Sequence, residues 1–159
     1  MYRRLRRLVF EERYGSGNRE ALKTLVDSGL VAGILAYQDN EAVACCSVAP
    51  MEDFPNLDRS PLLKRLDDAP AWSLTCFFIA GERRGAYMFS PLVEAALDYA
   101  KRRGASVVDA YPSLNIKRGS SDSDRCMGVH SAFLRLGFNE VARRRDERAI
   151  MRSYLTDYR

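Results

Sequence analysis

Two arginines and two glycines stand together in one short turn, which reads Gly81, Glu82, Arg83, Arg84, Gly85. An apolar run ends before this turn, and an amphipathic stretch begins after it. A helix that starts from such a turn offers unpaired backbone N–H groups and the positive end of its dipole, next to two guanidinium groups. These features suit a phosphate group, so the sequence predicts a phosphorylated ligand at this turn.

The elements that must position the turn form a strand–helix–strand unit over residues 72–111. Trp72–Ile79 is an apolar, β-rich run, and Ser106–Tyr111 is a second extended run. Between them, apolar residues recur at helical spacing, namely Leu92, Ala95, Ala96, Tyr99 and Ala100. This order predicts a parallel βαβ crossover. Because proline is comfortable only in the first turn of a helix, Pro91 predicts that the helix begins late, with Ser90 as its cap.

Composition indicates one domain over residues 1–159, because the chain is 47% apolar and 29% charged. No apolar run approaches the roughly 20 residues of a membrane span, so we expect a cytoplasmic protein without a membrane partner. The four cysteines lack CxxC spacing and there is a single histidine, which predicts reduced thiols and no metal site.

Positive charge gathers near both ends of the chain, but acidic residues are interleaved with it. The later cluster comprises Arg143, Arg144, Arg145, Arg148 and Arg152. We expect solvated faces here and do not expect a nucleic-acid partner.

The rest of the chain predicts an α+β domain with one mixed sheet. Residues 2–12 and 18–28 have helical patterns, and residues 33–37 and 42–48 read as a hairpin whose turn contains Asp39 and Asn40. A long acidic connection covers residues 50–70, and a strand pair closes the chain around residues 145–148.

Taken in order, several segments resemble the GNAT superfamily of acetyl-CoA-dependent N-acetyltransferases. They are Gly33–Tyr37, Ser47–Phe54, Cys76–Ile79, the Arg-Gly turn, Asp109–Pro112 and Phe133–Phe138. The resemblance implies a mostly antiparallel central sheet flanked by helices, with acetyl-CoA as co-substrate. It also implies that Phe78 and Ile79 line the pantetheine and thioester, and that Phe133 lies near the thiol. The implied pyrophosphate loop is Arg83, Arg84, Gly85, Ala86, Tyr87 and Met88.

Three features depart from the family pattern. Glu82 and Tyr87 stand where relatives have Gln or Arg and Gly or Ala, so we expect the Tyr87 ring to obstruct the phosphate site. Phe133 replaces a tyrosine that protonates the departing thiolate in many relatives, and a phenyl ring has no proton to donate. A strand that precedes the first helix in relatives is not evident. Either an exposed edge strand pairs with a second subunit, giving a homodimer, or the first residues take its place.

Candidate catalytic residues follow from the need to deprotonate an ammonium group before it can attack. Asp109 could act as base or substrate anchor, with an ordinary strand-edge salt bridge as the alternative, and Tyr111 could face the same acceptor cleft. His130 lies just before Phe133 and could exchange a proton near neutral pH, or could be a surface or capping residue. Cys76 has no evident base, so we expect a core thiol.

Two functions remain open from the sequence. The first is transfer of acetyl from acetyl-CoA, by direct attack, to an amine of a small molecule, peptide or protein. The alternative is a degenerate acyl-CoA-binding or assembly module without catalysis, in which Tyr87 fills the pyrophosphate site.

Overall fold

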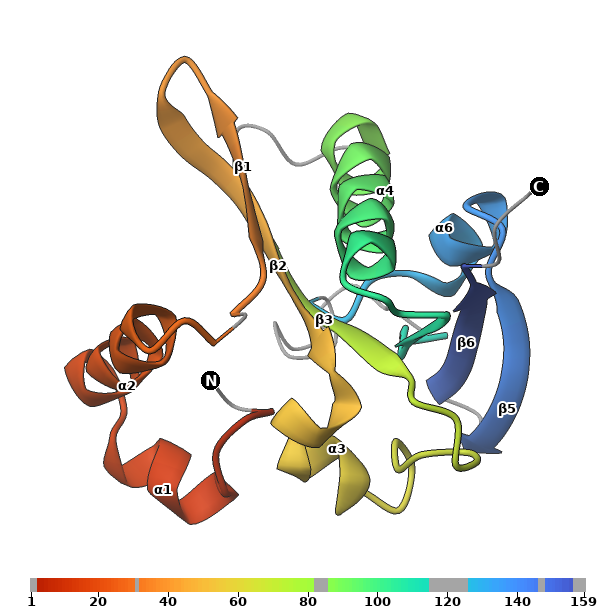
Figure 1. The fold of residues 1–159 in the computed structure, drawn as a ribbon, viewed down its shortest axis with the longest axis horizontal. Helices are drawn as coiled ribbons and strands as arrows, with labels where there is room; N and C mark the ends of the chain where they lie inside the picture. Colours follow the sequence, from red (N-terminus) through yellow and green to blue (C-terminus); the bar gives the residue numbers. More distant parts are fainter. Residues whose placement is uncertain (1–2, 31, 82–85, 115–125, 146–147, 156–159) are drawn as a thin grey trace.

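The computed structural model describes residues 3–30, 32–81, 86–114, 126–145 and 148–155. In chain order the elements are α1 (Arg7–Glu12), α2 (Ser16–Asp27), β1 (Ile34–Gln38), β2 (Glu41–Pro50), η1 (Met51–Asp53), α3 (Pro55–Asp58), β3 (Trp72–Ile79), α4 (Ala86–Arg102), β4 (Val107–Ala110), α6 (His130–Arg135), β5 (Asn139–Arg145) and β6 (Arg148–Tyr154). The strands form a six-stranded sheet in the order β1-β2-β3-β4-β6-β5. Within this sheet β3 and β4 are parallel and the other neighbours are antiparallel, so the predicted α+β class is confirmed (Figure 1).

The predicted crossover is present as β3, α4 and β4. Its strands pair from Trp72 opposite Val108 to Leu74 opposite Ala110. The apolar stripe of α4 packs on one face of the sheet, where Leu92, Val93, Ala96 and Ala100 are buried. This packing keeps the start of α4 close to the end of β3.

The predicted start of this helix is wrong. The helix begins at Ala86 and contains Pro91, so Ser90 is an interior residue and not the cap. The buried stripe that follows Pro91 stabilises the helix enough to include one proline. Since Pro91 has no N–H, the carbonyl of Tyr87 lacks its usual donor four residues later.

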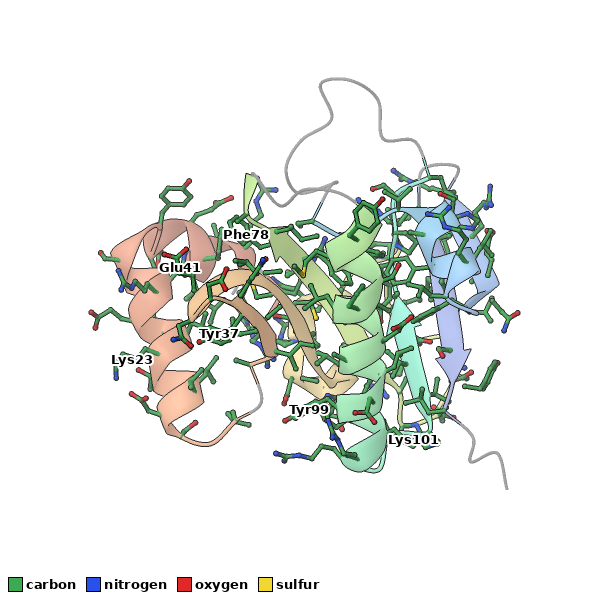
Figure 2. All side chains as sticks on the ribbon, turned by 90° about the horizontal axis from the view of Figure 1, so that it is seen from above. Lys23, Tyr37, Glu41, Phe78, Tyr99 and Lys101 are labelled. Carbon is green, nitrogen blue, oxygen red and sulfur yellow. The ribbon has the colours of Figure 1, made fainter. Side chains whose placement is uncertain are left out.

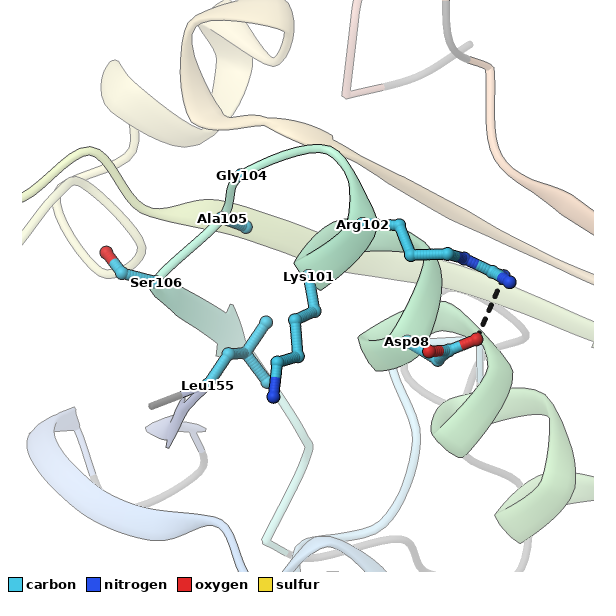
Figure 3. Close-up of a pocket in the computed structure, with 7 residues that line it drawn as sticks. All are labelled: Asp98, Lys101, Arg102, Gly104, Ala105, Ser106 and Leu155. Carbon is cyan, nitrogen blue, oxygen red and sulfur yellow. Dashed lines mark ion pairs between the residues drawn. The ribbon is translucent and has the colours of Figure 1, made fainter. Parts of the chain in front are cut away.

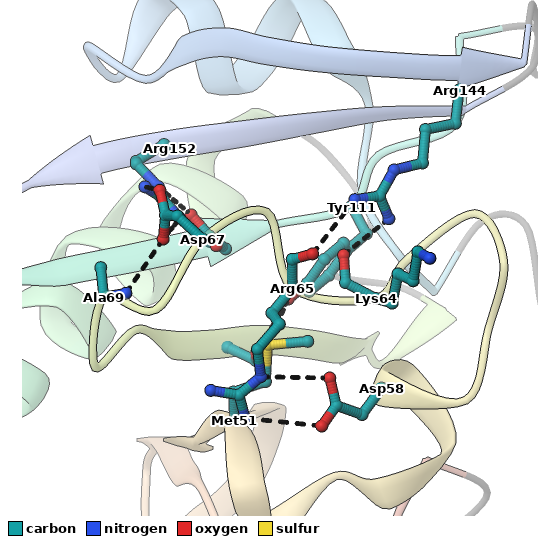
Figure 4. Close-up of polar contacts among 11 residues, drawn as sticks. Met51, Asp58, Lys64, Arg65, Asp67, Ala69, Tyr111, Arg144 and Arg152 are labelled. Carbon is teal, nitrogen blue, oxygen red and sulfur yellow. Dashed lines mark hydrogen bonds and ion pairs between the residues drawn. The ribbon is translucent and has the colours of Figure 1, made fainter.

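A second core covers the opposite face of the sheet. It consists of Ala49, Met51, Phe54, Leu57, Leu63, Tyr111, Met127 and Ile150. The connection that the sequence predicted as a long loop therefore contains two short helices, η1 and α3, which contribute to this core. Arg144 on β5 holds the following loop by donating to the carbonyls of Lys64, at 2.6 Å, and Arg65, at 3.1 Å (Figure 4).

The hairpin of β1 and β2 forms the free edge of the sheet and projects past the neighbouring elements (Figure 1). Asp39 and Asn40 adopt φ values of 51° and 64°, which confirms the predicted tight turn. At the base of β1, Gly33 has a φ of 150°, and a Cβ there would lie 2.1 Å from the carbonyl oxygen of Cys46. A glycine is therefore required where the incoming chain crosses β2.

Candidate active site

The central strand β3 loses one neighbour halfway along its length. Its pairing with β4 ends at Leu74, opposite Ala110, whereas β3 continues to Ile79. On the β2 side the register shifts, because Thr75 pairs with Ser47 and Phe78 pairs with Cys45. The extra residue lies at Cys76, whose φ of 54° is unfavourable for a residue with a side chain. A β-bulge thus turns the strand at the point where the sheet opens, and such bulges are frequent beside active sites.

A short segment before α6 lies against the opening. The backbone N–H of Phe77 donates to the carbonyl of Cys126 at 2.6 Å. The N–H of Ser113 donates to the carbonyl of Gly128 at 3.3 Å, which ties the segment to the chain that leaves β4. Residues 126–128 therefore occupy part of the space beside the bulge.

The two residues expected to line the pantetheine lie on opposite faces of β3. Phe78 is 57% exposed at the end of the strand (Figure 2). Ile79 is partly buried and packs on the core beneath α4. An extended thioester chain could pass over Phe78, whereas Ile79 supports the strand from below.

The start of α4 presents its expected ligand-binding residues in different ways. Met88 is partly buried and packs on the core, whereas Tyr87 is 95% exposed. Exposure of the Tyr87 ring corrects the expectation that it fills the phosphate position. Ala86 is the first residue of the helix, and Glu82, Arg83, Arg84 and Gly85 lie outside the described residues.

Phe133 belongs to an aromatic cluster next to the bulge. Its ring centroid lies 6.0 Å from that of Phe77, 5.4 Å from that of Phe89 and 5.0 Å from that of Phe138. The ring is fully buried, and a Cβ on Gly128 would come within 2.7 Å of it. Phe133 thus positions α6 and the 126–128 segment against β3 by packing.

Asp109 is enclosed in a buried ion pair. Arg152 on β6 donates to both carboxylate oxygens of Asp109, at 2.7 and 2.9 Å, and also contacts Asp67 at 2.6 Å (Figure 4). Burial raises the pKa of Asp109, and the hydrogen bonds from Arg152 oppose that rise. Of the two roles expected for Asp109, the salt bridge is thus the one that matches its surroundings. Asp109 does not face an open cleft. Burial of Arg152 also makes the expectation of a solvated arginine face wrong for this residue.

Tyr111 is likewise a core residue. Its side chain is 1% exposed, and its hydroxyl lies 2.9 Å from the Ser73 hydroxyl. Burial raises the pKa of this phenol above its ordinary value, which favours the neutral form. The expectation that Tyr111 faces an acceptor cleft is therefore wrong.

His130 is the first residue of α6, whereas Asp109 and Tyr111 lie in and directly after β4. Its Nε2 atom is 2.7 Å from a carboxylate oxygen of Glu140 on β5. Arg143 donates to both oxygens of the same carboxylate, and this contact, with a smaller contribution from His130, lowers the pKa of Glu140 to about 2. His130 therefore links α6 to β5, and the structure does not bring the three predicted catalytic residues into one cluster.

Sequence reasoning missed the role of Arg152, because its partners Asp67 and Asp109 are distant from it in the chain. Within the described ranges, no group of three or more His, Cys, Asp or Glu side chains could hold a metal ion.

A separate pocket of about 640 Å³ lies at the other end of α4. Its lining is Asp98, Lys101, Arg102, Gly104, Ala105, Ser106 and Leu155, with an ion pair of 2.9 Å between Asp98 and Arg102 (Figure 3). The β3 bulge precedes α4, whereas this pocket lies where the helix ends, so the pocket is distinct from the candidate site.

Comparison with solved structures identifies the architecture. An acetyltransferase assigned to the GNAT family from Desulfovibrio desulfuricans has a TM-score of 0.57 at 16% identity, over 87% of this chain and 79% of that one. The aminoglycoside 6'-N-acetyltransferase complexed with coenzyme A has a TM-score of 0.58 at 15% identity, over 96% and 88%. The ribosomal-protein-alanine N-acetyltransferase from Brucella melitensis has a TM-score of 0.53 at 16% identity, over 86% and 76%. The chain has the GNAT acetyltransferase fold.

No protein-family model matches this sequence, and no curated protein sequence matches it. In the part of the chain that the structure describes, no helix is both long and apolar enough to cross a membrane. The GNAT fold is thus established by architecture, at sequence identities of 15–16% to these structures.

Proposed function

We propose that the protein transfers an acetyl group from acetyl-CoA to an amine by direct attack of the amine on the thioester. The observation that carries the proposal is the end of β3, beside the start of α4. There the strand has a bulge and stays paired with β2, but its pairing with β4 has ended. Backbone amides near a strand opening can hold a thioester carbonyl, and a helix start can hold a phosphate. The chain supplies both features in sequence order.

In this proposal Phe78 contacts the pantetheine, Ile79 and Met88 support the site from the core, and Phe133 packs beside the thioester. Arg83, Arg84, Gly85 and Ala86 bind the pyrophosphate, while Tyr87 stays in solvent. Such a loop fits a CoA phosphate because it joins two guanidinium groups to a helix start. Acetyl-CoA would supply the activated acetyl group.

The Phe77 amide is already bound by the Cys126 carbonyl, at 2.6 Å. If the thioester carbonyl is held by this amide, residues 126–128 must first move away from β3. Phe133 cannot protonate the leaving group, so we propose that CoA leaves as a thiolate and takes its proton from water. The acceptor amine attacks in its neutral form. Asp109 and Tyr111 are buried in the core, so His130 remains the predicted contributor to deprotonation of the amine.

The acceptor is an amine of a small molecule, peptide or protein. Among structural neighbours, one is named for an aminoglycoside and another for a ribosomal-protein alanine. These names support the class of reaction, which is acetyl transfer to an amine.

Three measurements test the proposal. Calorimetric titration with acetyl-CoA and with desulfo-CoA measures the dissociation constant of each ligand. Thermal unfolding should show a rise in melting temperature, because acetyl-CoA at 100 times its dissociation constant adds about 2.7 kcal/mol to the free energy of unfolding. Free-thiol release with a panel of amines then gives turnover. Binding without turnover on any amine would favour the non-catalytic module, and absence of binding at millimolar acetyl-CoA would refute both.

A further inference from the structure

Residues 126–128 bond to both arms of the opening between β3 and β4. The Cys126 carbonyl accepts from the Phe77 N–H of β3 at 2.6 Å, and the Gly128 carbonyl accepts from the Ser113 N–H, beyond the end of β4, at 3.3 Å. Val129, the next residue, forms a parallel bridge with Ser113. Backbone groups of the 126–128 segment therefore take the place of a strand neighbour where the pairing of β3 with β4 has ended.

Two anchors on opposite faces of the sheet hold the segment in this position. The Met127 side chain is fully buried in the second core, which also contains Tyr111. On the α4 face, a Cβ on Gly128 would lie 2.7 Å from the Phe133 ring and 3.0 Å from the Phe89 ring. Gly128 also has a φ of 81°, which residues with a side chain rarely adopt. The position of the segment thus depends on one buried methionine and on the lack of a side chain at residue 128.

We propose that the 126–128 segment competes with acetyl-CoA for the Phe77 amide, so that the protein is autoinhibited until the segment leaves the opening. The inference rests on the proposed function, in which a backbone amide of β3 holds the thioester carbonyl. A backbone N–H is a single donor that serves one well-aligned acceptor. The Cys126 carbonyl and the thioester carbonyl therefore exclude each other at this amide.

The competition has a consequence for affinity. Acetyl-CoA binds only the molecules whose segment has moved away, so its apparent dissociation constant is the intrinsic constant divided by the fraction of such molecules. Substitutions that weaken either anchor raise this fraction. They should therefore tighten the binding of acetyl-CoA, whereas loss of packing at a site formed in advance would weaken it.

Two substitutions should displace the segment, and each has a matched control. Gly128→Ala adds a methyl group that meets the Phe133 ring at a strained φ. Its control is Gly137→Ala, because Gly137 has the same φ of 81° and a Cβ there meets nothing within 4 Å. Met127→Ala removes the anchor in the second core. Its control is Met151→Ala, which removes an equally buried methionine from the core beneath α4.

The first experiment measures amide hydrogen exchange by NMR in the full-length protein without ligand. The quantity compared is the exchange rate of the Phe77 N–H divided by that of the Leu74 N–H, which lies where β3 is paired on both sides. This ratio separates local opening from global unfolding. We expect it to rise at least tenfold in Gly128→Ala and Met127→Ala, and to keep its wild-type value in both controls. An unchanged ratio in both segment variants would overturn the proposal, because the segment would then leave Phe77 only when the sheet unfolds.

The second experiment titrates acetyl-CoA into the same five proteins by calorimetry. We expect at least tenfold tighter binding to Gly128→Ala and Met127→Ala, and wild-type affinity for both controls. Equal or weaker binding to the two segment variants would show that the segment does not compete with the ligand, and would overturn the autoinhibition. If none of the five proteins binds acetyl-CoA, the proposed function fails, while the exchange ratio still decides whether the segment opens locally.

Discussion

At the scale of single residues, burial separates the side chains with structural roles from those that a ligand can reach. Asp109 and Arg152 are 2% and 4% exposed, whereas Phe78 and Tyr87 are 57% and 95% exposed. Residue type alone had suggested catalysis for Asp109 and obstruction for Tyr87. The environment assigns the first to the core and the second to solvent.

Asp109→Asn is expected to lower the free energy of unfolding by about 3 kcal/mol, because it leaves Arg152 buried with one carboxylate partner, Asp67. Urea unfolding measures this loss. The matched control is Asp58→Asn, which breaks the exposed pair with Arg65 and should cost under about 1 kcal/mol. If Asp109→Asn abolished turnover and kept full stability, a direct catalytic role would be favoured instead.

Tyr87→Gly should not tighten acetyl-CoA binding, because the exposed ring blocks nothing in the described structure. Glycine in a helix costs about 1 kcal/mol relative to a good helix former, so a small fall in melting temperature is expected. Titration calorimetry of both proteins at equal ionic strength measures the affinity. A gain of threefold or more would show that the ring does enter the phosphate site in solution.

At the scale of elements, the local sequence pattern predicted helices and turns well. It predicted poorly the contacts between residues that are distant in the sequence. Helical spacing from Leu92 to Ala100 and the Asp39–Asn40 turn are local signals, and both elements formed as expected. The bulge at Cys76 has no such signal, because it depends on register with β2. The bond from the Phe77 amide to the Cys126 carbonyl and the pairing of Arg152 with Asp109 are set by tertiary packing, so the sequence could not reveal the true surroundings of the candidate site.

Gly33→Ala is expected to destabilise the fold by about 3 kcal/mol, because the added methyl would meet the Cys46 carbonyl and the positive φ would be strained. Thermal unfolding measures the effect. Gly81→Ala is the control, since a Cβ there meets nothing within 4 Å. Equal stability of the two variants would mean that the crossing at β2 relaxes easily.

The link between α6 and β5 predicts a pH dependence. Arg143 and His130 lower the pKa of Glu140 from 4.5 to about 2, so the contribution of this carboxylate to stability is fully present above pH 4.5 and is lost as the pH falls towards 2. The groups are partly exposed to solvent, so the effect on the free energy of unfolding should stay under about 1 kcal/mol. Urea unfolding at several pH values should show a flatter profile for Glu140→Gln than for the wild type. Identical slopes would contradict the link.

At the scale of the whole molecule, one end of the sheet is strand β1, which pairs with β2 alone among the described strands. The residues of β1 are Ile34, Leu35, Ala36, Tyr37 and Gln38, so the strand carries none of the charges that often protect edges. Residues 3–30 fold mainly as helices, and within the described chain they add no strand outside β1. Of the two alternatives for the missing strand, the paired edge is therefore the one we retain as a prediction.

We expect concentration-dependent dimers in sedimentation velocity, formed through β1. Leu35→Lys places a charge on this edge and should shift the equilibrium to monomers, because Leu35 is 59% exposed there. Leu8→Lys is the control, at an exposed leucine of α1. A wild-type monomer at all concentrations, or equal dissociation by both variants, would contradict pairing at this edge.

The position of β6 has a consequence for how the chain folds during synthesis. β6 follows the other strands in sequence, yet it lies between β4 and β5 and brings Arg152 to Asp109. Until the ribosome has released β6, β4 has an open side and Asp109 lacks its main buried partner. Domains often begin to fold from the N-terminus during translation. This sheet, however, can be completed only after its last strand has emerged from the ribosome. Nascent chains stalled before residue 148 should therefore remain sensitive to proteases.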